Sequence, residues 1–369
     1  MIVGVDAREA RGPSLEQPVG AAGRGRYVNE LLRHLPQVEP ETKFLLYTSA
    51  APPQDDLPPN ATWRPMASSS PHWHLRAAKA IRNECDLYLS LSYLTSFFLD
   101  AYVQTVFDLI AFKDFALSPG RSRRVERLTL RRAVRRARAI LTISEATAAD
   151  LAELVPEAAG KTTVTPLAAD GRFAPDPAPE EVERVRARYE LEDGFVLATG
   201  TIEPRKNYVR LVRAHAALPN DLRHAYPLVL AGRRGWDYEP ILAAMASHAD
   251  PPVRILGFVP DADLAVLYAE ATVFCYPSRY EGFGLPVLEA MQAGAPVVTS
   301  NVSSLPEVGG DAVRYVDPND AGDLRTALEE LLEDEGRRAE LRAAGLERAK
   351  LFSWEQTART TMEVLRAVG

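Results

Sequence analysis

The sequence predicts an α/β protein made of two Rossmann-like domains, each built on a doubly wound parallel sheet. The chain of 369 residues is too long for one typical hydrophobic core, and its 46% hydrophobic and 25% charged residues are those of a folded globular protein. Short apolar runs rich in β-branched residues alternate with longer helical patterns, which is typical of βαβ units. The alternation starts again in the second half. We therefore expect two domains that face each other across a ligand-binding cleft at the carboxyl ends of their strands.

The predicted strands fall into two sets, separated by a proline-rich and charged segment at residues 170–194. The first set is IVGVD (2–6), KFLLYT (43–48), DLYLSL (86–91), VQTVFD (103–108) and AILTIS (139–144). The second set is FVLATGT (195–201), PLVLAG (227–232), VRILGF (253–258), TVFCYP (272–277), PVVTS (296–300) and AVRYVD (312–317). We place the boundary after residue 185, so that the N-terminal domain spans residues 1–185.

Composition and cysteine usage narrow the class of protein. The formal net charge of −7 argues against a dedicated nucleic-acid binder, whose phosphate contacts require a basic domain. Cys85 and Cys275 lie far apart in apolar runs, which indicates buried thiols in a reducing compartment. The chain has no basic N-terminal leader pattern and no apolar run of about 18 residues. We expect a cytoplasmic protein that is at most peripheral on the inner face of the membrane.

The motif YEGFGLPVLE in the second half has the pattern of an anion site. Gly282 and Gly284 let the turn approach a ligand closely, and Pro286 suits the first turn of a helix whose N–H groups point at that turn. Glu289 can accept hydrogen bonds from vicinal hydroxyls, and Glu281 precedes the predicted phosphate position. A second interpretation stays open, in which Glu281 is a surface turn residue and Glu289 an exposed helix residue favoured by the helix dipole.

Two adjacent cations follow the first strand of the second half. Arg205 and Lys206 lie at the start of a helix that begins near Asn207, where positive charge is unfavourable to the helix itself. They indicate a clamp for an anion, and the alternative is a solvated basic turn. Together with the glycine turn, they favour a diphosphate site.

Several segments resemble one known family. GTIEPRKN, LVLAGRRGW and YPSRYEGFGLPVLEAMQAGAPVVTSNVSSLPEVGGDAVRYVDP resemble the second domain of the family-4 (group 1) retaining glycosyltransferases, and Glu281 and Glu289 match that family's E-x7-E motif. GRGRYVNELLRHL, LTISEATAADL and VTPLAADGRF resemble the first domain and its exit. The resemblance covers nearly the whole chain and implies the GT-B fold. It assigns residues 186–350 to the nucleotide-sugar-binding domain, and residues 351–369 to a helix that packs back on the N-terminal, acceptor-binding domain.

The resemblance also implies a role for each matched residue. Arg205 and Lys206 would bind the diphosphate of a nucleotide-sugar donor and stabilise the charge on the departing nucleoside diphosphate, with no metal ion and no other cofactor. Glu289 would bind the ribose, and Glu281 would bind the donor sugar as a catalytic residue. The backbone of the turn would bind sugar or phosphate through Gly282, Phe283, Gly284 and Leu285.

The first domain contributes weaker candidates. Gly20, Gly23 and Gly25 precede a helical pattern and suit a flexible loop near the donor phosphate, although an ordinary turn is an equal interpretation. Many members of the family have His-Asp where this chain has Phe107-Asp108, and a phenyl ring cannot donate the hydrogen bond of an imidazole. Asp108 either takes part in acceptor activation, as a catalytic residue, or caps the strand end.

Two further segments allow more than one interpretation. Residues 121–139 hold nine arginines, and Val125, Leu128, Ala133, Val134 and Ala137 are able to share a packed helix face. We favour that packed helix over a basic surface for an anionic membrane or a lipid-diphosphate acceptor. His72 and His74 would lie on one side of an extended segment, but without further ligands they do not predict a metal site.

We conclude from the sequence that the protein is a retaining, metal-independent glycosyltransferase. It would move a sugar from a nucleotide-sugar, with GDP-mannose or a deoxysugar nucleotide favoured over UDP-glucose, to a hydroxyl of a glycan or lipid-linked acceptor. One alternative is a nucleotide-sugar epimerase of the same fold. The other is a non-catalytic protein that binds an anionic membrane or nucleic acid through residues 121–139.

Overall fold

The computed structural model describes most of the chain and divides it into two compact units. The first unit comprises Met1–Lys113, Gly120–Leu167 and Ser353–Gly369, and the second comprises Ala168–Phe352. The structure describes residues 1–10, 23–49, 51–53, 57–66, 72–113, 120–247, 250 and 253–369, with the side chains of residues 120–123 excepted.

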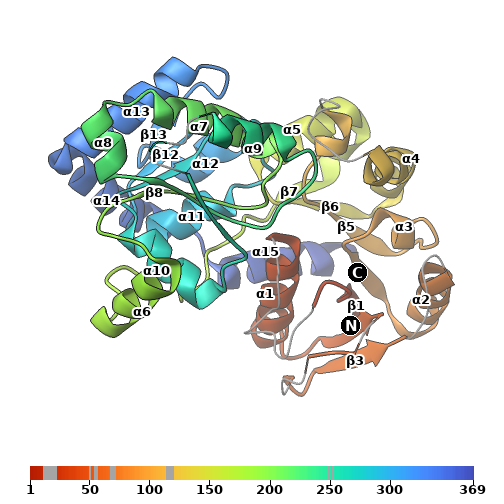
Figure 1. Ribbon diagram of the computed structural model, residues 1–369. Helices are drawn as coiled ribbons and strands as arrows, with labels where there is room; N and C mark the ends of the chain where they lie inside the picture. Colours follow the sequence, from red (N-terminus) through yellow and green to blue (C-terminus); the bar gives the residue numbers. More distant parts are fainter. Residues whose placement is uncertain are drawn as a thin grey trace. The chain divides into compact units, whose positions relative to one another are not determined.

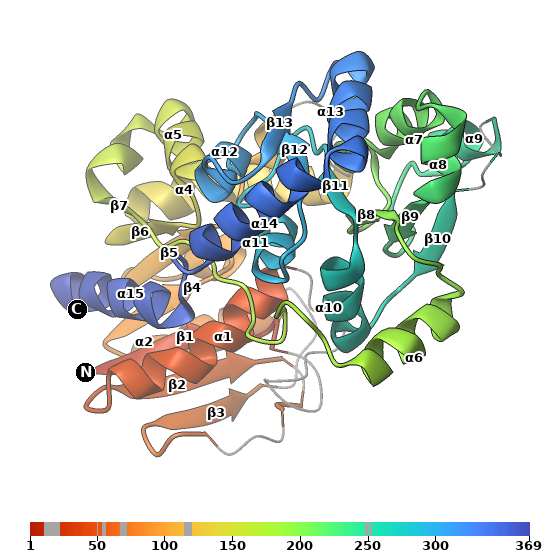
Figure 2. The ribbon, with the colours of Figure 1, turned by 90° about the vertical axis from the view of Figure 1, so that its left-hand side faces the viewer.

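The first unit is built on a parallel sheet of seven described strands in the order β3-β2-β1-β4-β5-β6-β7 (Figures 1 and 2). The strands are β1 (Ile2–Asp6), β2 (Lys43–Thr48), β3 (Ala61–Pro65), β4 (Leu87–Ser90), β5 (Tyr102–Val106), β6 (Ala139–Thr142) and β7 (Thr162–Val164). Its helices are α1 (Gly23–Val38), α2 (His72–Glu84), α3 (Tyr93–Ser96), α4 (Gly120–Arg136), α5 (Glu145–Leu154) and α15 (Trp354–Val368). Every residue of β4, β5 and β6 is buried, as their near-continuous apolar sequences require in a sheet covered on both faces.

The last helix of the chain belongs to the first unit, as the family resemblance implied. α15 lies beside α1 in both ribbon views (Figures 1 and 2). Trp354 packs against Tyr27 with their ring centroids 6.2 Å apart, and the guanidinium of Arg138 donates a hydrogen bond of 2.7 Å to the carbonyl of Val368. The N-cap Ser353, whose hydroxyl accepts from the amide of Gln356, fixes where α15 begins.

The second unit is built on a parallel sheet of six described strands in the order β10-β9-β8-β11-β12-β13. The strands are β8 (Val196–Thr199), β9 (Leu228–Ala231), β10 (Arg254–Gly257), β11 (Val273–Tyr276), β12 (Val297–Ser300) and β13 (Arg314–Val316). Its helices are α6 (Pro179–Tyr189), α7 (Tyr208–Ala216), α8 (Asn220–Ala225), α9 (Glu239–Ala246), α10 (Asp261–Glu270), α11 (Leu285–Gln292), α12 (Leu305–Gly309), α13 (Ala321–Glu333) and α14 (Glu335–Ala349). α7 packs against α9 and α13, whereas α11 packs against α10, α12 and α14.

The boundary between the units differs from the one predicted. It lies between Leu167 and Ala168 instead of after residue 185, because α6 packs within the second unit. Arg184 of α6 donates a hydrogen bond of 2.7 Å to the carboxylate of Asp263 at the start of α10. The charged helical stretch that resembled a connection is therefore part of the second unit.

The two cysteines are free thiols. Cys275 is buried in β11, and Cys85 is half-buried with its sulfur 3.5 Å from the hydroxyl of Tyr47. Among the described helices, none is both long enough and apolar enough to cross a lipid bilayer.

Candidate functional site

The second unit brings the predicted anion-binding residues together at the carboxyl edge of its sheet. β8 and β11 are adjacent and parallel, so the segments that follow them leave the sheet at the same edge. Residues 204–206 form a short 3₁₀ turn after β8. The amide of Arg279, in the segment after β11, donates a hydrogen bond of 2.9 Å to the carbonyl of Arg205. The two segments are thus joined through their backbones.

Arg205, Lys206 and Glu281 form a buried cluster of charges at this edge, which we call the cation cluster. Lys206 Nζ donates a hydrogen bond of 2.7 Å to Glu281 Oε1, and the guanidinium of Arg205 donates to Glu281 Oε2. Arg205 also binds Glu203 through Nη2 at 2.7 Å. Lys206 Nζ lies 4.5 Å from the ring centroid of Tyr276 and donates to its hydroxyl. Two cations held in place by ion pairs give a rigid positive centre.

Burial and mutual attraction set the protonation of this cluster. Burial by itself would raise the pKa of Glu281, but Arg205 and Lys206 lower it to about 2. Burial is the main cause that lowers the pKa of Lys206 to about 8, and repulsion from Arg205 adds to it, despite the contact with Glu281. An arriving diphosphate would replace lost hydration around Lys206 with negative charge and so favour its ammonium form.

Two glycines allow the backbone to pass close to Lys206. Gly200 has φ +116°, and a Cβ built there would lie 3.2 Å from Lys206 Cε. A Cβ on Gly232 would lie only 1.9 Å from the carbonyl oxygen of Gly200. No other residue type fits at position 232 without moving the segment after β8.

The glycine turn and α11 lie as the motif predicted. Gly284 is the N-cap of α11 with φ +109°, and a Cβ there would lie 2.8 Å from Leu305 Cδ2. Phe283 and Leu285 on either side of it are buried. Gly282 lies in the same turn, directly after Glu281.

Glu289 is buried rather than displayed on the helix surface. Its exposed fraction is 4%, and that of Glu281 is 9%, so the interpretation of both as exposed residues is wrong. Tyr268 donates a hydrogen bond of 3.2 Å to Glu289 Oε2, and its hydroxyl lies 2.9 Å from Thr199 Oγ1 at the end of β8. The solvated-turn interpretation of Arg205 and Lys206 is wrong as well, since Lys206 is buried and Arg205 is half-buried between two carboxylates.

Asn207 is a structural residue of this edge that the sequence reasoning did not assign. It holds a left-handed conformation with φ +63°, and its Nδ2 donates to the carbonyls of Pro277 at 3.0 Å and Pro318 at 2.7 Å. Its Oδ1 accepts a hydrogen bond of 3.0 Å from Arg210. An asparagine directly after two cations and before an apolar helix was the available signal, because asparagine tolerates this conformation better than most residues.

The corresponding edge of the first unit holds a looser set of charges. The guanidinium of Arg24 lies 4.7 Å from the ring centroid of Phe107 and donates a hydrogen bond of 3.2 Å to the carbonyl of Leu91. Asp108 Oδ1 accepts from the amide of Ile110 at 3.1 Å. At the position where the family resemblance implied an imidazole, this chain has a phenyl ring that lies beside an arginine. Asp108 caps the turn after its strand, and that contact leaves its other carboxylate oxygen for further partners.

Glu126 is a second carboxyl at this edge that the sequence reasoning missed. Burial raises its pKa to about 7, the charge of Asp108 adds to the rise, and Arg24 opposes it. Arg127, the next residue of α4, donates a hydrogen bond of 2.7 Å to the carbonyl of Ala111 and so anchors the helix beside residues 108–112. A single glutamate among nine arginines gave no pattern that would identify it.

Gly23 and Gly25 were predicted in a loop ahead of a helix, but the structure places both within α1. Gly23 is its first residue, and Gly25 is buried within its first turn. Gly20 lies outside the described residues.

The outward and inward faces of α4 differ from those predicted. Ala133, Val134 and Ala137 are buried as expected, and Leu130 joins them. Val125 and Leu128 are instead 52% and 80% exposed. The expected packed face is therefore only partly correct, and two apolar side chains lie among arginines on the surface.

His72 and His74 do not lie on one side of an extended segment, because both belong to α2. His74 is buried, its Nδ1 lies 2.8 Å from Thr95 Oγ1, and burial lowers its pKa to about 4. Trp73 is buried under the guanidinium of Arg8. The described residues contain no group of three or more histidine, cysteine or acidic side chains that could hold a metal ion.

Comparison with known proteins identifies the family. Residues 180–348 match the sequence profile of the glycosyl transferases group 1. Over 295 residues the chain is 38% identical to the O-antigen chain mannosyltransferase B of Escherichia coli. The match covers 79% of this chain and 77% of that protein. The chain belongs to the group 1 glycosyltransferases. It is also 38% identical over 232 residues to the serotype-specific mannosyltransferase WbdA of Escherichia coli, covering 62% of this glycosyltransferase and 28% of WbdA.

Solved structures show that this glycosyltransferase has the GT-B fold. Sucrose-phosphate synthase from Thermosynechococcus elongatus matches with a TM-score of 0.81 at 21% identity, over 100% of this chain and 98% of that one. WaaG, a glycosyltransferase involved in lipopolysaccharide biosynthesis, matches with a TM-score of 0.75 at 17% identity, over 99% of each chain. At these identities the likeness concerns the fold alone. The family and the fold do not support the epimerase or the non-catalytic alternative.

Proposed function

We propose that this glycosyltransferase is a retaining mannosyltransferase that uses GDP-mannose to extend a bacterial glycan, carried on a lipid or growing as a polysaccharide. The proposal is supported by the 38% identity to an O-antigen chain mannosyltransferase across 77% of that protein. The observation that carries the chemistry is the cation cluster at the carboxyl edge of β8 and β11.

In this proposal the cation cluster binds the donor diphosphate. Arg205 and Lys206 take up the negative charge that develops on GDP as the bond to the sugar breaks. Because two fixed cations supply this charge, we propose that transfer requires no metal ion. The cluster is already held by Glu281 before the donor binds, so little reorganisation is needed.

The two glutamates divide the remaining contacts with the donor. Glu289, oriented by Tyr268, accepts hydrogen bonds from the ribose hydroxyls. Both oxygens of Glu281 already accept from cations, and their remaining lone pairs accept from the mannose hydroxyls. The amides around Gly284 bind phosphate or sugar at the start of α11.

In the first unit we propose that Asp108 helps to remove the proton of the acceptor hydroxyl. Its neighbour Glu126, whose pKa is raised to about 7, is able to share that proton near neutral pH. We assign no nucleophile on the other face of the sugar.

The proposal is tested by calorimetric titration of UDP, GDP, dTDP and ADP into protein freed of metal with a chelator. GDP should bind with the highest affinity, and Glu289→Ala should abolish most of that affinity. Transfer or slow hydrolysis of GDP-mannose should persist with the chelator present, and ¹H NMR of the first product formed should show the α-anomer of mannose. Selective binding of another nucleotide would overturn GDP-mannose as the donor. A requirement for metal would overturn metal independence, and the β-anomer would overturn the retaining mechanism.

We also propose that α4 holds the enzyme on an anionic membrane surface, where a lipid-linked acceptor would lie. Val125 and Leu128 are exposed among arginines, and Arg132 lies 4.5 Å from the ring centroid of the exposed Phe97. Apolar side chains flanked by cations are suited to the headgroup region.

Sedimentation with phosphatidylglycerol vesicles tests this membrane proposal. Leu128→Asp should reduce vesicle binding strongly. Leu351→Asp is the matched control, because Leu351 is 70% exposed but lies in the second unit. Equal binding of both variants, or no binding of the unaltered protein, would contradict the proposal.

A further inference from the structure

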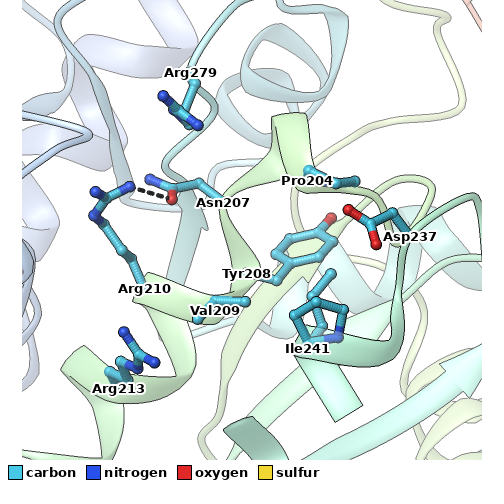
Figure 3. A pocket seen from close by; sticks show the side chains of 10 residues that line it. Pro204, Asn207, Tyr208, Val209, Arg210, Arg213, Asp237, Ile241 and Arg279 are labelled. Atoms are coloured by element: carbon cyan, nitrogen blue, oxygen red, sulfur yellow. Dashed lines mark hydrogen bonds between the residues drawn. The ribbon is translucent and has the colours of Figure 1, made fainter. Parts of the chain in front are cut away.

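A ligand-sized cavity lies in the second unit, next to the cation cluster but separate from it. Its volume is about 290 Å³, at the small end of the range for ligand cavities. It lies at the start of α7 and is bordered on the other side by the segment that leads into α9 (Figure 3). Lys206, Glu281 and Glu289 are not among the residues that line it.

The cavity carries a concentration of positive charge. Three arginines line it, Arg210, Arg213 and Arg279, against one carboxylate, Asp237. Figure 3 shows the guanidiniums of Arg210 and Arg213 on one side of Tyr208 and Asp237 on the other.

These arginines are not neutralised within the protein. Arg210 donates to a neutral group, the amide oxygen of Asn207. In the part of the chain that the structure describes, the guanidiniums of Arg213 and Arg279 have no ion-pair or hydrogen-bond partner. Guanidinium groups that line one cavity and have no carboxylate partner are suited to a phosphoryl group, which accepts their paired hydrogen bonds.

The rest of the cavity wall is apolar and fixed. Pro204, Val209 of α7 and Pro240 of α9 supply its accessible apolar surface. Tyr208 and Ile241 are buried behind them, and the hydroxyl of Tyr208 donates a hydrogen bond of 2.7 Å to the carbonyl of Thr199, which holds its ring in place. An apolar wall opposite a cationic one suits a compact ligand with a C–H face and a phosphate, and the volume admits about one monosaccharide unit.

The cavity shares its walls with the segments that carry the cation cluster. Pro204 and Asn207 line it, while Arg205 and Lys206 between them bind Glu281. A ligand that drew Arg210 away from Asn207 would act directly on the residue that fixes the end of this turn.

We propose that this cavity binds a phosphorylated monosaccharide and that its occupancy changes the affinity of the cation cluster for a nucleoside diphosphate. The phosphate lies between Arg210, Arg213 and Arg279, and the sugar ring lies on Pro204, Val209 and Pro240. The binding site exists whether or not the donor is GDP-mannose. The effect on nucleotide affinity rests on the proposed function.

The experiment is calorimetric titration of mannose 6-phosphate, mannose and inorganic phosphate into the full-length protein. Mannose 6-phosphate should bind, and Arg213→Gln should weaken its binding by about tenfold or more, as expected for loss of a charge-assisted hydrogen bond. Arg337→Gln is the matched control, because Arg337 is an arginine of α14 paired only on the surface with Glu340. Circular dichroism establishes that both variants are folded.

A second titration separates this cavity from the donor site. Lys206→Ala protein should still bind mannose 6-phosphate, and GDP affinity in the unaltered protein should change by roughly fivefold or more when the sugar phosphate is present. Loss of sugar-phosphate binding in Lys206→Ala but not in Arg213→Gln would place the ligand in the donor site and overturn the proposal. Equal affinity for inorganic phosphate, or no binding of any probe, would also overturn it. An unchanged GDP affinity would refute only the proposed effect of the sugar phosphate on nucleotide binding, and not the binding site itself.

Discussion

The carboxyl edges of the two sheets hold their charges in opposite ways. In the second unit, Lys206 and Glu281 are buried and each contacts several fixed partners. In the first unit, Asp108 and Glu126 are only half-buried, repel each other, and have Arg24 as their nearby cation. The difference indicates that the cation cluster, whose charges are already held in place by fixed partners, suits a ligand of constant charge such as a diphosphate. A carboxyl such as Glu126, whose pKa is raised to about 7, instead suits a site where a proton must be gained or lost.

The largest effect should follow from removing a cation of the second unit. Lys206→Ala should lower kcat for sugar transfer by roughly 10²–10³-fold, in line with the loss of one positioned group that stabilises developing charge. Asp108→Asn at the other edge should cost less, because the acceptor proton can also pass to Glu126 or water. Steady-state kinetics checks this order, with Arg337→Ala as the surface control. A smaller loss in Lys206→Ala than in Asp108→Asn would reverse the comparison.

The two glutamates of the E-x7-E motif should separate binding from transfer. Glu289→Ala should weaken GDP binding by about tenfold or more, because a buried acceptor for the ribose hydroxyls is lost. Glu281→Gln should keep or increase GDP affinity while it depresses transfer, since the two cations no longer share their charge with a carboxylate. Calorimetry and kinetics on both variants test this, and equal loss of GDP affinity in both would contradict it.

The affinity of the second unit for a nucleoside diphosphate should fall as pH rises above about 8. The pKa of free Lys206 is lowered to about 8, so its ammonium is neutralised over this range and one attractive charge is lost. The groups that face it are Glu281, Tyr276, Arg205 and Glu203. Titration of GDP between pH 7 and pH 9.5 measures the effect, which should be roughly tenfold.

Lys206→Arg is the control for this pH dependence. A guanidinium stays charged throughout the range, so the variant should bind GDP with a flat pH profile. A decline of the same size in both proteins would show that another group titrates.

The smallest effect concerns stability at the edge of the first unit. The folded-state pKa of Glu126 is raised to about 7 from an ordinary value of 4.5, so its stabilising contribution is present below pH 4.5 and is lost as pH rises through 7. Glu126→Gln cannot ionise and should be more stable than the unaltered protein at pH 8 by roughly 1 kcal/mol. Urea unfolding at pH 5 and pH 8 tests this. A variant that is less stable at pH 8 would show that ionised Glu126 is favourable.

Sequence patterns were sufficient for the fold because alternation of apolar strands and helices is a local property. They failed where the local signal was weak. β3 and β7 are absent from the predicted strands, because β3 lies in a proline-rich stretch and β7 is too short to leave a pattern. The helix that contains His72 and His74 was taken for an extended segment, because two histidines around a tryptophan carry no helical periodicity.

The sequence was sufficient to identify the residues of the candidate site, but not the contacts between them. Arg205, Lys206, Glu281 and Glu289 were all identified, yet nothing in the sequence places the cations directly on Glu281. That contact exists because β8 and β11 are neighbours in the sheet although two strands and several helices separate them along the chain. Strand order depends on long-range packing. The same reason explains Leu128, whose exposure depends on which neighbours cover α4.

The return of α15 to the first unit constrains the order in which the protein is made. Trp354 packs on Tyr27 of α1, and Val368 accepts a hydrogen bond from Arg138, so the first unit includes residues that the ribosome adds after the whole second unit. The second unit is contiguous from Ala168 to Phe352 and can fold as it emerges. During synthesis, the first unit is therefore the first to emerge from the ribosome and the last to be completed. Until then the α1 surface that faces Trp354 is open to other apolar partners, including chaperones.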